Sequence, residues 1–250
     1  MNFTILRFDE LASTNTEALN QAKQGADEGL CIVAERQTAG RGRHGRVWLS
    51  EKNAGLYFSL VLRPRLENKF LPLITLMTAV VVFDLLAELY QLKPDIKWAN
   101  DVHINGKKIS GILAEMTETA SGAAIVVGIG INLKSSNFPP ELKEIATSIE
   151  EETHQTPDIE MLLRNLTRLF NDFYQILNSE NGAEKIRLEW AQRSSYFSGK
   201  SVKAVLENET MTGITCGIEE NGALRIQMES GEIKIIQAGD VEMLRKIERE

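Results

Sequence analysis

The sequence has few of the features that mark several common protein classes. Its 250 residues include only two cysteines, Cys31 and Cys216, which lie far apart and form no CxxC pair. This argues against a zinc site and a disulfide scaffold, and it agrees with a reducing compartment. No signal-peptide stretch opens the chain. The longest uncharged run, residues 70–83, has 14 residues and contains Pro72, so we expect a buried helix rather than a membrane span. A cytoplasmic protein without a membrane partner is expected.

An excess of positive charge is absent as well. Asp and Glu outnumber Lys and Arg by 35 to 28, which gives a net charge of −7 at pH 7. A general nucleic-acid binder shows the opposite balance. The apolar fraction of 43% and the charged fraction of 25% are ordinary for a globular protein of one or two domains.

The order of apolar patterns predicts a mixed region followed by a small β region. A polar cap at 13–16 predicts the start of the first helix, and Asn105-Gly106 is the strongest hairpin signal in the chain. From about residue 195, short β-like runs alternate with Gly and Asn turns, which is typical of a small antiparallel barrel or sandwich. The chain is therefore expected to be α+β, with domains 1–195 and 196–250. The expected strands are 3–8, 30–35, 56–62, 96–98, 102–104, 108–116 and 123–129, and the expected helices end near 24 and span 70–91 and 158–178.

A local basic island stands out in this acidic chain. Residues 36–46 contain Arg36, Arg41, Arg43 and Arg46 among several glycines, and no acidic residue occurs from 36 to 50. Glycine exposes backbone N–H groups and arginine offers forked donors, so the segment predicts an anion-binding loop. It matches neither a P-loop nor a GxGxxG fingerprint. The alternative is an ordinary solvated loop.

Two lysine-containing segments follow. Lys97 to Asp101 (KWAND) could hold a nucleotide phosphate and Mg²⁺, because magnesium needs only one or two carboxylates besides the phosphates; the alternative is a plain strand turn. Strand alternation is expected to place Lys108 on one face with Ser110 and then Ile112. An inward lysine needs an anionic partner. The alternative is that Lys107 and Lys108 are ordinary hairpin charges.

Two further patterns carry weaker signals. Gly128 and Gly130 alternate within a strand, which marks the close approach of a ligand or a backbone, or else a structural bulge. Ser13-Thr14-Asn15 with Gln37 could contact a ureido or amide group, or the first three could simply cap a helix. No Ser/His/Asp or Cys/His set is evident, which argues against nucleophilic catalysis.

Taken together, these segments resemble the biotin protein ligases, the enzymes that attach biotin to a lysine of a carrier domain. The resemblance covers nearly the whole chain, and GRGRxGR followed by KWxND is its specific part. It implies a catalytic domain related to class II aminoacyl-tRNA synthetases, with a mixed sheet and packed helices, plus a C-terminal SH3-like β-barrel. It rests on STN at 13–15, QTAGRGRHGRVW at 37–48, KWANDV at 97–102, KKISGIL at 107–113 and GIGIN at 128–132.

The resemblance implies a two-step reaction that uses biotin, ATP and Mg²⁺. The biotin carboxylate attacks the α-phosphate of ATP to give biotinyl-5′-AMP and pyrophosphate. A lysine of the biotin carboxyl carrier domain of acetyl-CoA carboxylase then attacks the mixed anhydride. Catalysis would consist of positioning and electrostatic stabilisation, without a covalent enzyme intermediate.

The resemblance also implies roles for individual residues. Lys108, Arg43 and Lys97 would be the catalytic charges, and Asp101 would hold the metal. Biotin would contact Ser13, Thr14, Asn15, Gln37, Arg41, Gly42, Arg43, Lys108, Gly111, Gly128 and Gly130. The nucleotide would contact Arg43, Arg46, Trp48, Lys97, Asn100, Asp101, Lys108, Asn132 and Arg245.

The chain departs from the family pattern at Ala99, where KWPND is usual, and we expect altered loop rigidity rather than lost activity. The expected catalytic domain starts near Phe3, which leaves no room for the N-terminal DNA-binding domain of some relatives, so a monofunctional ligase without a DNA partner is expected. Relatives often dimerise through a sheet edge, which favours a homodimer. The alternatives are a lipoate or other acyl-adenylating ligase on the same fold, a DNA-binding regulator or biotin sensor, and a tRNA-acting synthetase.

Overall fold

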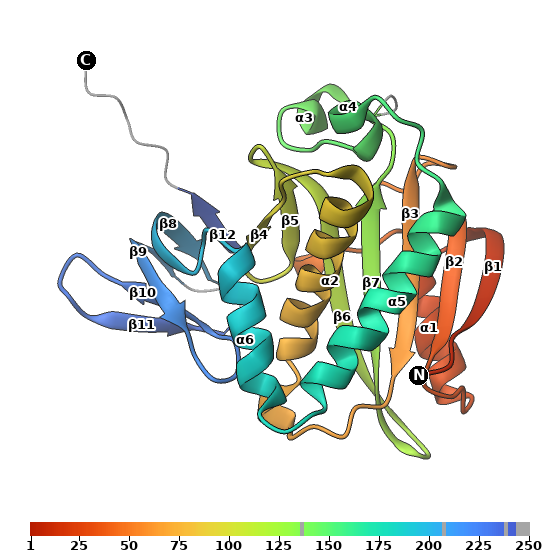
Figure 1. Ribbon diagram of the computed structural model, residues 1–250, viewed down its shortest axis with the longest axis horizontal. Helices are drawn as coiled ribbons and strands as arrows, with labels where there is room; N and C mark the ends of the chain where they lie inside the picture. The colour runs from red at the N-terminus through yellow and green to blue at the C-terminus, as the bar shows by residue number, and fades with distance from the viewer. Residues whose placement is uncertain (136–137, 207–208, 238–239, 244–250) are drawn as a thin grey trace.

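The first structural unit is a mixed sheet of seven strands. A computed structural model describes residues 1–135, 138–206, 209–237 and 240–243. The strand order is β1-β2-β3-β7-β6-β5-β4, in which β1 and β2 are parallel and the other pairs are antiparallel (Figure 1). The sheet is therefore open, with β1 and β4 as its edges. Its strands are β1 (Thr4–Leu11), β2 (Leu30–Gln37), β3 (Gly55–Leu62), β4 (Asp95–Lys97), β5 (Asp101–Ile104), β6 (Lys107–Thr119) and β7 (Gly122–Asn132).

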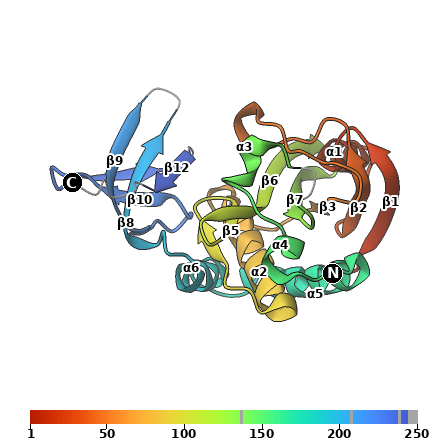
Figure 2. The same cartoon turned by 90° about the horizontal axis from the view of Figure 1, so that it is seen from above.

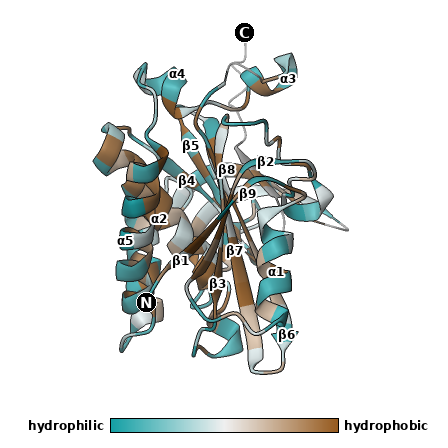
Figure 3. Ribbon diagram, turned by 90° about the vertical axis from the view of Figure 1, so that its right-hand side faces the viewer, coloured by the Kyte–Doolittle hydropathy of each residue, from teal (hydrophilic) through white to brown (hydrophobic). Residues whose placement is uncertain are grey.

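Helices cover both faces of this sheet. Helix α1 (Thr14–Lys23) lies on one face, and α2 (Leu73–Tyr90) and α5 (Ile159–Leu177) lie on the other, as Figure 3 shows. Helix α6 (Gly182–Arg193) packs against α2 and α5. Short helices α3 (Pro140–Lys143) and α4 (Ile149–Thr153) and the 3₁₀ turns Arg43–Gly45 and Asn68–Phe70 complete this unit.

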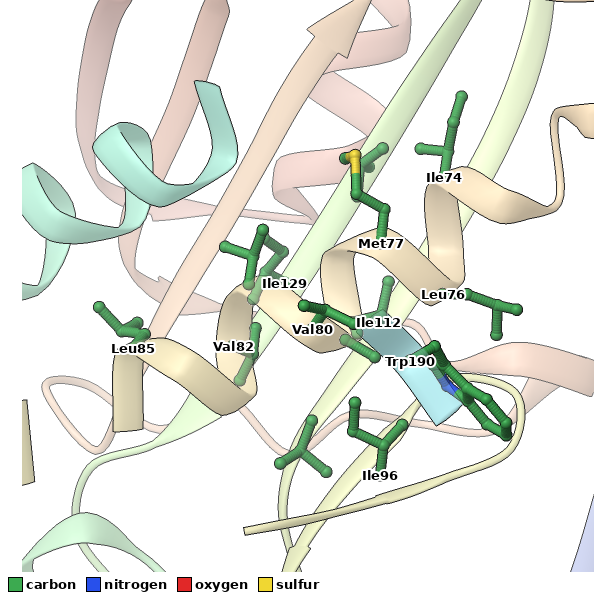
Figure 4. Close-up of a cluster of buried hydrophobic side chains, with 14 of the residues drawn as sticks. Ile74, Leu76, Met77, Val80, Val82, Leu85, Ile96, Ile112, Ile129 and Trp190 are labelled. Carbon is green, nitrogen blue, oxygen red and sulfur yellow. The ribbon is translucent and has the colours of Figure 1, made fainter. Parts of the chain in front are cut away.

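The main hydrophobic core lies between the sheet and α2. Most of α2 is fully buried, and its side chains meet those of β4, β6 and β7 and Trp190 of α6 (Figure 4). The segment Asn68–Tyr90 is long and apolar enough to cross a membrane by length and composition, but 61% of its apolar window is buried inside the fold. A helix that is apolar on every side is stable in water only when neighbours cover it, as they do here. The run 70–83 thus forms a core helix, as expected.

The side chains of strand β7 alternate between the main core and the opposite face of the sheet. Val127, Ile129 and Ile131 point into the main core, whereas Val126 belongs to a smaller cluster with α1. Successive strand residues point to opposite faces, so Gly128 and Gly130 fall on the α1 face. That face therefore has no side chain over the middle of β7.

The second unit is an antiparallel sheet of five strands in the order β11-β10-β9-β8-β12. It stands beside the β4 edge and α6 (Figure 2). Trp98 Nε1 donates to the Gly222 carbonyl at 2.9 Å, and Ser194 Oγ donates to the Ile96 carbonyl at 2.6 Å. These bonds fix the second sheet against the first. Its strands are β8 (Ser198–Val205), β9 (Thr210–Ile218), β10 (Leu224–Gln227), β11 (Ile233–Ile236) and β12 (Asp240–Met243).

The expected architecture is confirmed, namely a mixed sheet with packed helices followed by a small antiparallel sheet. All seven expected strands of the first unit are present, and Asn105 and Gly106 have φ of 51° and 81°, as a two-residue hairpin turn requires. Helix α6 was not predicted. It buries only Gly182, Ile186 and Trp190, so its apolar stripe is too narrow to stand out in the sequence.

Candidate active site

A cavity of about 940 Å³ lies over the α1 face of the sheet. Its lining comes from the start of α1, the loop after β2, strands β3 to β7, the segment 138–146 around α3 and the start of the second sheet. Every site residue expected from the sequence lines this cavity, with the exception of Arg245, which lies outside the described residues. Segments more than 100 residues apart are thus brought together at one site.

One end of the cavity carries a network of short polar side chains. The backbone N and Oγ1 of Thr14 donate to Gln37 Oε1 at 2.8 and 3.1 Å. Ser59 Oγ is placed 2.8 Å from Thr14 Oγ1 and 2.6 Å from Asn15 Oδ1. Ser13 is the N-cap residue of α1, yet its side chain makes no capping hydrogen bond. Simple helix capping therefore does not explain these residues, whereas a preorganised polar recognition end does.

Glu115 connects this polar end to the arginine loop. Its carboxylate accepts two hydrogen bonds from the Arg41 guanidinium, at 2.9 and 2.7 Å, and one from Asn15 Nδ2 at 2.8 Å. Paired arginine–carboxylate bonds of this kind fix orientation as well as distance. Sequence reasoning gave no role to Glu115 or Ser59. Glu115 follows Gly111 and Leu113 at intervals of two on β6, and this spacing is the signal that could have found it.

Glycines form the floor of the cavity because other groups occupy the space of a side chain. A Cβ on Gly128 would lie 2.1 Å from Asn15 Oδ1, and one on Gly130 would lie 2.5 Å from Trp48 Cε2. On Gly111 a Cβ would approach Trp48 Cζ3 to 2.9 Å. The pairing of β3 with β7 runs without interruption past both β7 glycines. The alternative of a bulge is thus wrong, and close approach accounts for these residues.

Lys108 lies at the centre of the cavity. Its Nζ is 2.7 Å from Asp101 Oδ1 and 5.3 Å from the centre of a Trp48 ring, and its side chain remains 31% exposed. The ammonium has the anionic partner that an inward lysine needs. An ordinary hairpin charge would not be held in this way.

The face of Lys108 differs from the expectation. The β5–β6 register shifts between Val102 and His103, whose partners are Ser110 and Lys108, so one residue of β6 is extra there. Such a β-bulge reverses the alternation beyond it. Lys108 consequently shares the cavity face with Gly111, its Nζ only 3.0 Å from the position of a Cβ there, while Ser110 is fully buried elsewhere.

The basic loop is tied to the KWAND segment. Arg43 donates to Asn100 Oδ1 at 2.8 Å, and Asn100 Nδ2 donates to the Ile112 carbonyl at 3.0 Å. Trp98 anchors the same segment to the second sheet, and the peptide bond between Trp98 and Ala99 is cis. The guanidinium of Arg43 is therefore positioned by Asn100, a polar residue of a distant segment.

Asn132, the last residue of β7, is also fixed: its Nδ2 donates to the Thr147 carbonyl at 3.0 Å.

Several lining residues were not expected from the sequence, and His103, Tyr196 and Lys200 are the titratable ones with the most notable surroundings. His103 is half-buried, and burial lowers its pKa to about 4, against the opposing effect of Asp101. Its imidazole is therefore neutral at pH 7. Tyr196 and Lys200 enter the cavity from the second unit. Burial raises the pKa of Tyr196 to about 12, and the negative charges of Asp95 and Asp101 add to the shift. No sequence pattern links residues 196–200 to the first unit, so only the fold could identify them.

Comparison with known proteins agrees with this geometry. A sequence profile of the biotin/lipoate A/B protein ligase family matches residues 8–132, and one of the biotin protein ligase C-terminal domain matches residues 197–244. The bifunctional ligase/repressor BirA of Bacillus subtilis (strain 168) is 36% identical over 242 residues, which cover 96% of this chain and 74% of that protein.

The chain belongs to the biotin/lipoate A/B protein ligase family.

Two further relatives of this ligase support the assignment. The biotin--[acetyl-CoA-carboxylase] ligase of Mycobacterium tuberculosis (strain ATCC 25618 / H37Rv) is 30% identical over 241 residues, which cover 94% of this chain and 87% of that protein. The solved structure of the Aquifex aeolicus biotin protein ligase in complex with biotin and ATP superposes with a TM-score of 0.83. It is 32% identical, and the match covers 97% of this chain and 99% of that one. The similarity therefore spans both sheets of the ligase.

Proposed function

We propose that this ligase activates biotin with ATP and transfers it to a lysine of the biotin carboxyl carrier domain of acetyl-CoA carboxylase. The observation that carries the proposal is a single cavity with neutral polar groups at one end and cations beyond them. Thr14, Asn15 and Gln37 suit the ureido group of biotin, which offers both donors and an acceptor. Lys108 and Arg43 suit the carboxylate and the phosphate that react.

In the first step the biotin carboxylate forms a bond to the α-phosphorus of ATP, and the bond to the pyrophosphate oxygen breaks. Lys108 is the cation assigned to the carboxylate and the α-phosphate, and Arg43 and Lys97 stabilise the remaining phosphate charge. Fixed charges of this kind act where negative charge accumulates in the transition state. No side-chain nucleophile takes part, since the carboxylate itself attacks.

The remaining lining residues position the two substrates. Gly111, Gly128 and Gly130 let Trp48, Lys108 and Asn15 lie close against the backbone, so that these side chains can line the place proposed for biotin, while Ser13 completes the ureido end. Arg41 and Gly42 belong to the loop that covers biotin and the adenylate. Trp48, Arg46, Asn100 and Asn132 face the nucleotide. A role of Arg245 on the adenine side stays a prediction.

Magnesium fits this cavity through Asp101. The carboxylate lines the cavity beside the proposed phosphate positions and is 19% exposed. Among the described residues no group of three His, Cys, Asp or Glu side chains could hold a metal, so phosphates would supply the other ligands, as Mg²⁺ prefers. When bound, the ion neutralises phosphate charge. The chain's own part is to present the Asp101 carboxylate next to Lys108.

In the second step the carrier lysine attacks the mixed anhydride and releases AMP. The proposal includes a catalytic domain of residues 1–195 and a β domain of residues 196–250, and strands β8 to β12 all follow this boundary. Both cysteines are free thiols, which agrees with a cytoplasmic location. The net charge of −7 argues against DNA as a partner. A homodimer paired through a sheet edge is part of the proposal.

The experiment is biotin-dependent release of pyrophosphate from MgATP, followed by addition of a biotin carboxyl carrier domain. We expect release with biotin and acid-stable labelling of the carrier lysine. Release with lipoate instead of biotin would keep the adenylation chemistry but refute the substrate. Silence with both acids would refute the proposed reaction.

A further inference from the structure

The C-terminal sheet contributes a cation to the cavity. Lys200, on β8, lines it together with Tyr196. Its Nζ donates to Ser195 Oγ at 2.7 Å, lies 4.0 Å from Asp95 Oδ2 and stands 4.7 Å from the centre of the Tyr196 ring. These contacts hold the ammonium at the wall of the cavity rather than in solvent, and its side chain is only 24% exposed.

The segment that carries Lys200 is firmly attached to the edge of the first sheet. Asp95 of β4 accepts hydrogen bonds from the backbone N and Oγ of Ser195 at 2.8 and 2.6 Å. The backbone N of Lys200 donates to Thr215 Oγ1 at 3.0 Å. Lys200 is therefore preorganised and does not depend on the closure of a loop.

The strand order places Lys200 at the opposite end of the cavity from the ureido-binding residues. Asn15 packs over Gly128 of β7. Next across the sheet come β6 with Lys108, β5 with Asp101, and the edge strand β4 with Asp95, against which Lys200 lies. His103 of β5 lies between these groups, since the charges of Lys97, Asp101, Lys108 and Asp95 all act on its pKa. All four charged side chains line the cavity between its two ends.

The chemistry of the proposed reaction then indicates which part of the substrates lies at the Lys200 end of the cavity. The carboxylate attacks in line, so the pyrophosphate leaves on the side of the α-phosphorus that faces away from biotin. With biotin over β7 and the α-phosphate beside Lys108, that direction points toward β4. Resting on the proposed function, we propose that Lys200 binds the β- and γ-phosphates of ATP and the pyrophosphate that leaves. The electron pair of the broken bond stays on the pyrophosphate oxygen, and Lys200 donates a hydrogen bond without giving up its proton.

This assignment separates the two halves of the reaction. A charged hydrogen bond to the pyrophosphate portion exists with ATP and with free pyrophosphate, but not with biotinyl-5′-AMP. Lys200→Ala is expected to weaken binding of α,β-methylene-ATP, measured by calorimetry with biotin present, by about tenfold or more while AMP binding is unchanged. The KM for pyrophosphate in the reverse reaction rises by a similar factor. Transfer from preformed biotinyl-5′-AMP to the carrier keeps its rate.

Two variants and one comparison make the test decisive. Lys200→Arg keeps the positive charge and restores most of the affinity. Lys234→Ala, on β11 in the same sheet, removes an exposed lysine paired with Glu232 and leaves every parameter unchanged. Equal binding of α,β-methylene-ATP by Lys200→Ala and the unaltered ligase overturns the proposal, as does an equal loss in the transfer step. If the unaltered ligase releases no pyrophosphate with biotin, that result refutes the proposed function instead. The role of Lys200 is still decided in that case by the ratio of the α,β-methylene-ATP affinities of Lys200→Ala and the unaltered ligase, because this ratio does not depend on turnover.

Discussion

Substituting Gly128 with alanine tests the architecture of the biotin end. The three atoms nearest to the added Cβ all belong to Asn15, with Oδ1 at 2.1 Å, Cγ at 2.8 Å and Nδ2 at 3.0 Å. Because Gly128 lies in the middle of β7 and the backbone there cannot retreat, the Asn15 side chain must move. It then loses its contacts with Ser59 at 2.6 Å, with the Leu113 carbonyl at 3.1 Å and with Glu115 at 2.8 Å.

The size of the effect follows from these three hydrogen bonds. Neutral bonds contribute about 1 kcal/mol each and the bond to a carboxylate about 2 kcal/mol, so Gly128→Ala is expected to cost about 2 to 4 kcal/mol of stability, part of it recovered by water. Biotin also loses a positioned partner, which weakens its binding by about tenfold or more. Binding of ATP, whose proposed contacts lie beyond Lys108, stays within about a factor of two.

The assay is a calorimetric titration of biotin into four proteins: the unaltered ligase, Gly128→Ala, Asn15→Ala and the double variant. Removing the Asn15 side chain removes the clash. The free energy of biotin binding of the double variant is therefore expected to match that of Asn15→Ala within about 0.5 kcal/mol. Unchanged biotin affinity in Gly128→Ala would refute the reasoning. Fully additive losses in the double variant would show that the alanine acts through some other contact.

Three further outcomes are expected. Lys108→Ala slows pyrophosphate release by about 100-fold or more, as loss of a transition-state donor does. It leaves thermal stability intact because the Lys108 side chain is 31% exposed. Near-normal release would refute the proposed role of Lys108. Arg43→Ala breaks the 2.8 Å contact with Asn100 and lets biotinyl-5′-AMP escape faster in a filtration assay, and an unchanged escape rate would exclude the covering role. Burial raises the pKa of Cys31 to about 12. Iodoacetamide at pH 8 is therefore expected to modify the partly exposed Cys216 and to spare Cys31 until the chain is unfolded. Modification of Cys31 in the folded protein, read by mass spectrometry, would contradict the burial.

The elements that local sequence determines were predictable. The strands of the first sheet carry short apolar runs, the hairpin at Asn105 carries its turn signal, and α5 carries a wide apolar stripe. The residues of GRGRHGR and KWAND that line the cavity stand out in the sequence because unusual residue types are concentrated there. Helix α6 was missed because it buries only Gly182, Ile186 and Trp190, which is too narrow an apolar stripe to stand out in the sequence.

The residues that escaped prediction depend on long-range contacts. Ser59 lies in a strand buried on every residue, so nothing in the local pattern distinguishes it from core. The direction of Lys108 depends on one extra residue in β6 opposite Val102 and His103, and a bulge leaves no mark in apolar spacing. Lys200 is held at the cavity by contacts such as the bond from Ser195 to Asp95, 100 residues away in the chain.

The second sheet can be recognised by its sequence, but its described residues form no hydrophobic core separate from that of the first unit. Val202, Leu224 and Ile226 belong to the same buried cluster as α2 and Trp190, and a Cβ on Gly222 would meet Leu76 at 2.6 Å. A continuous core couples the unfolding of everything that contributes to it. The boundary near residue 195 is thus a boundary of architecture and not of cooperativity. A substitution that loosens the packing of the C-terminal sheet on α2 is therefore expected to lower the stability of the first sheet and of the cavity that it carries.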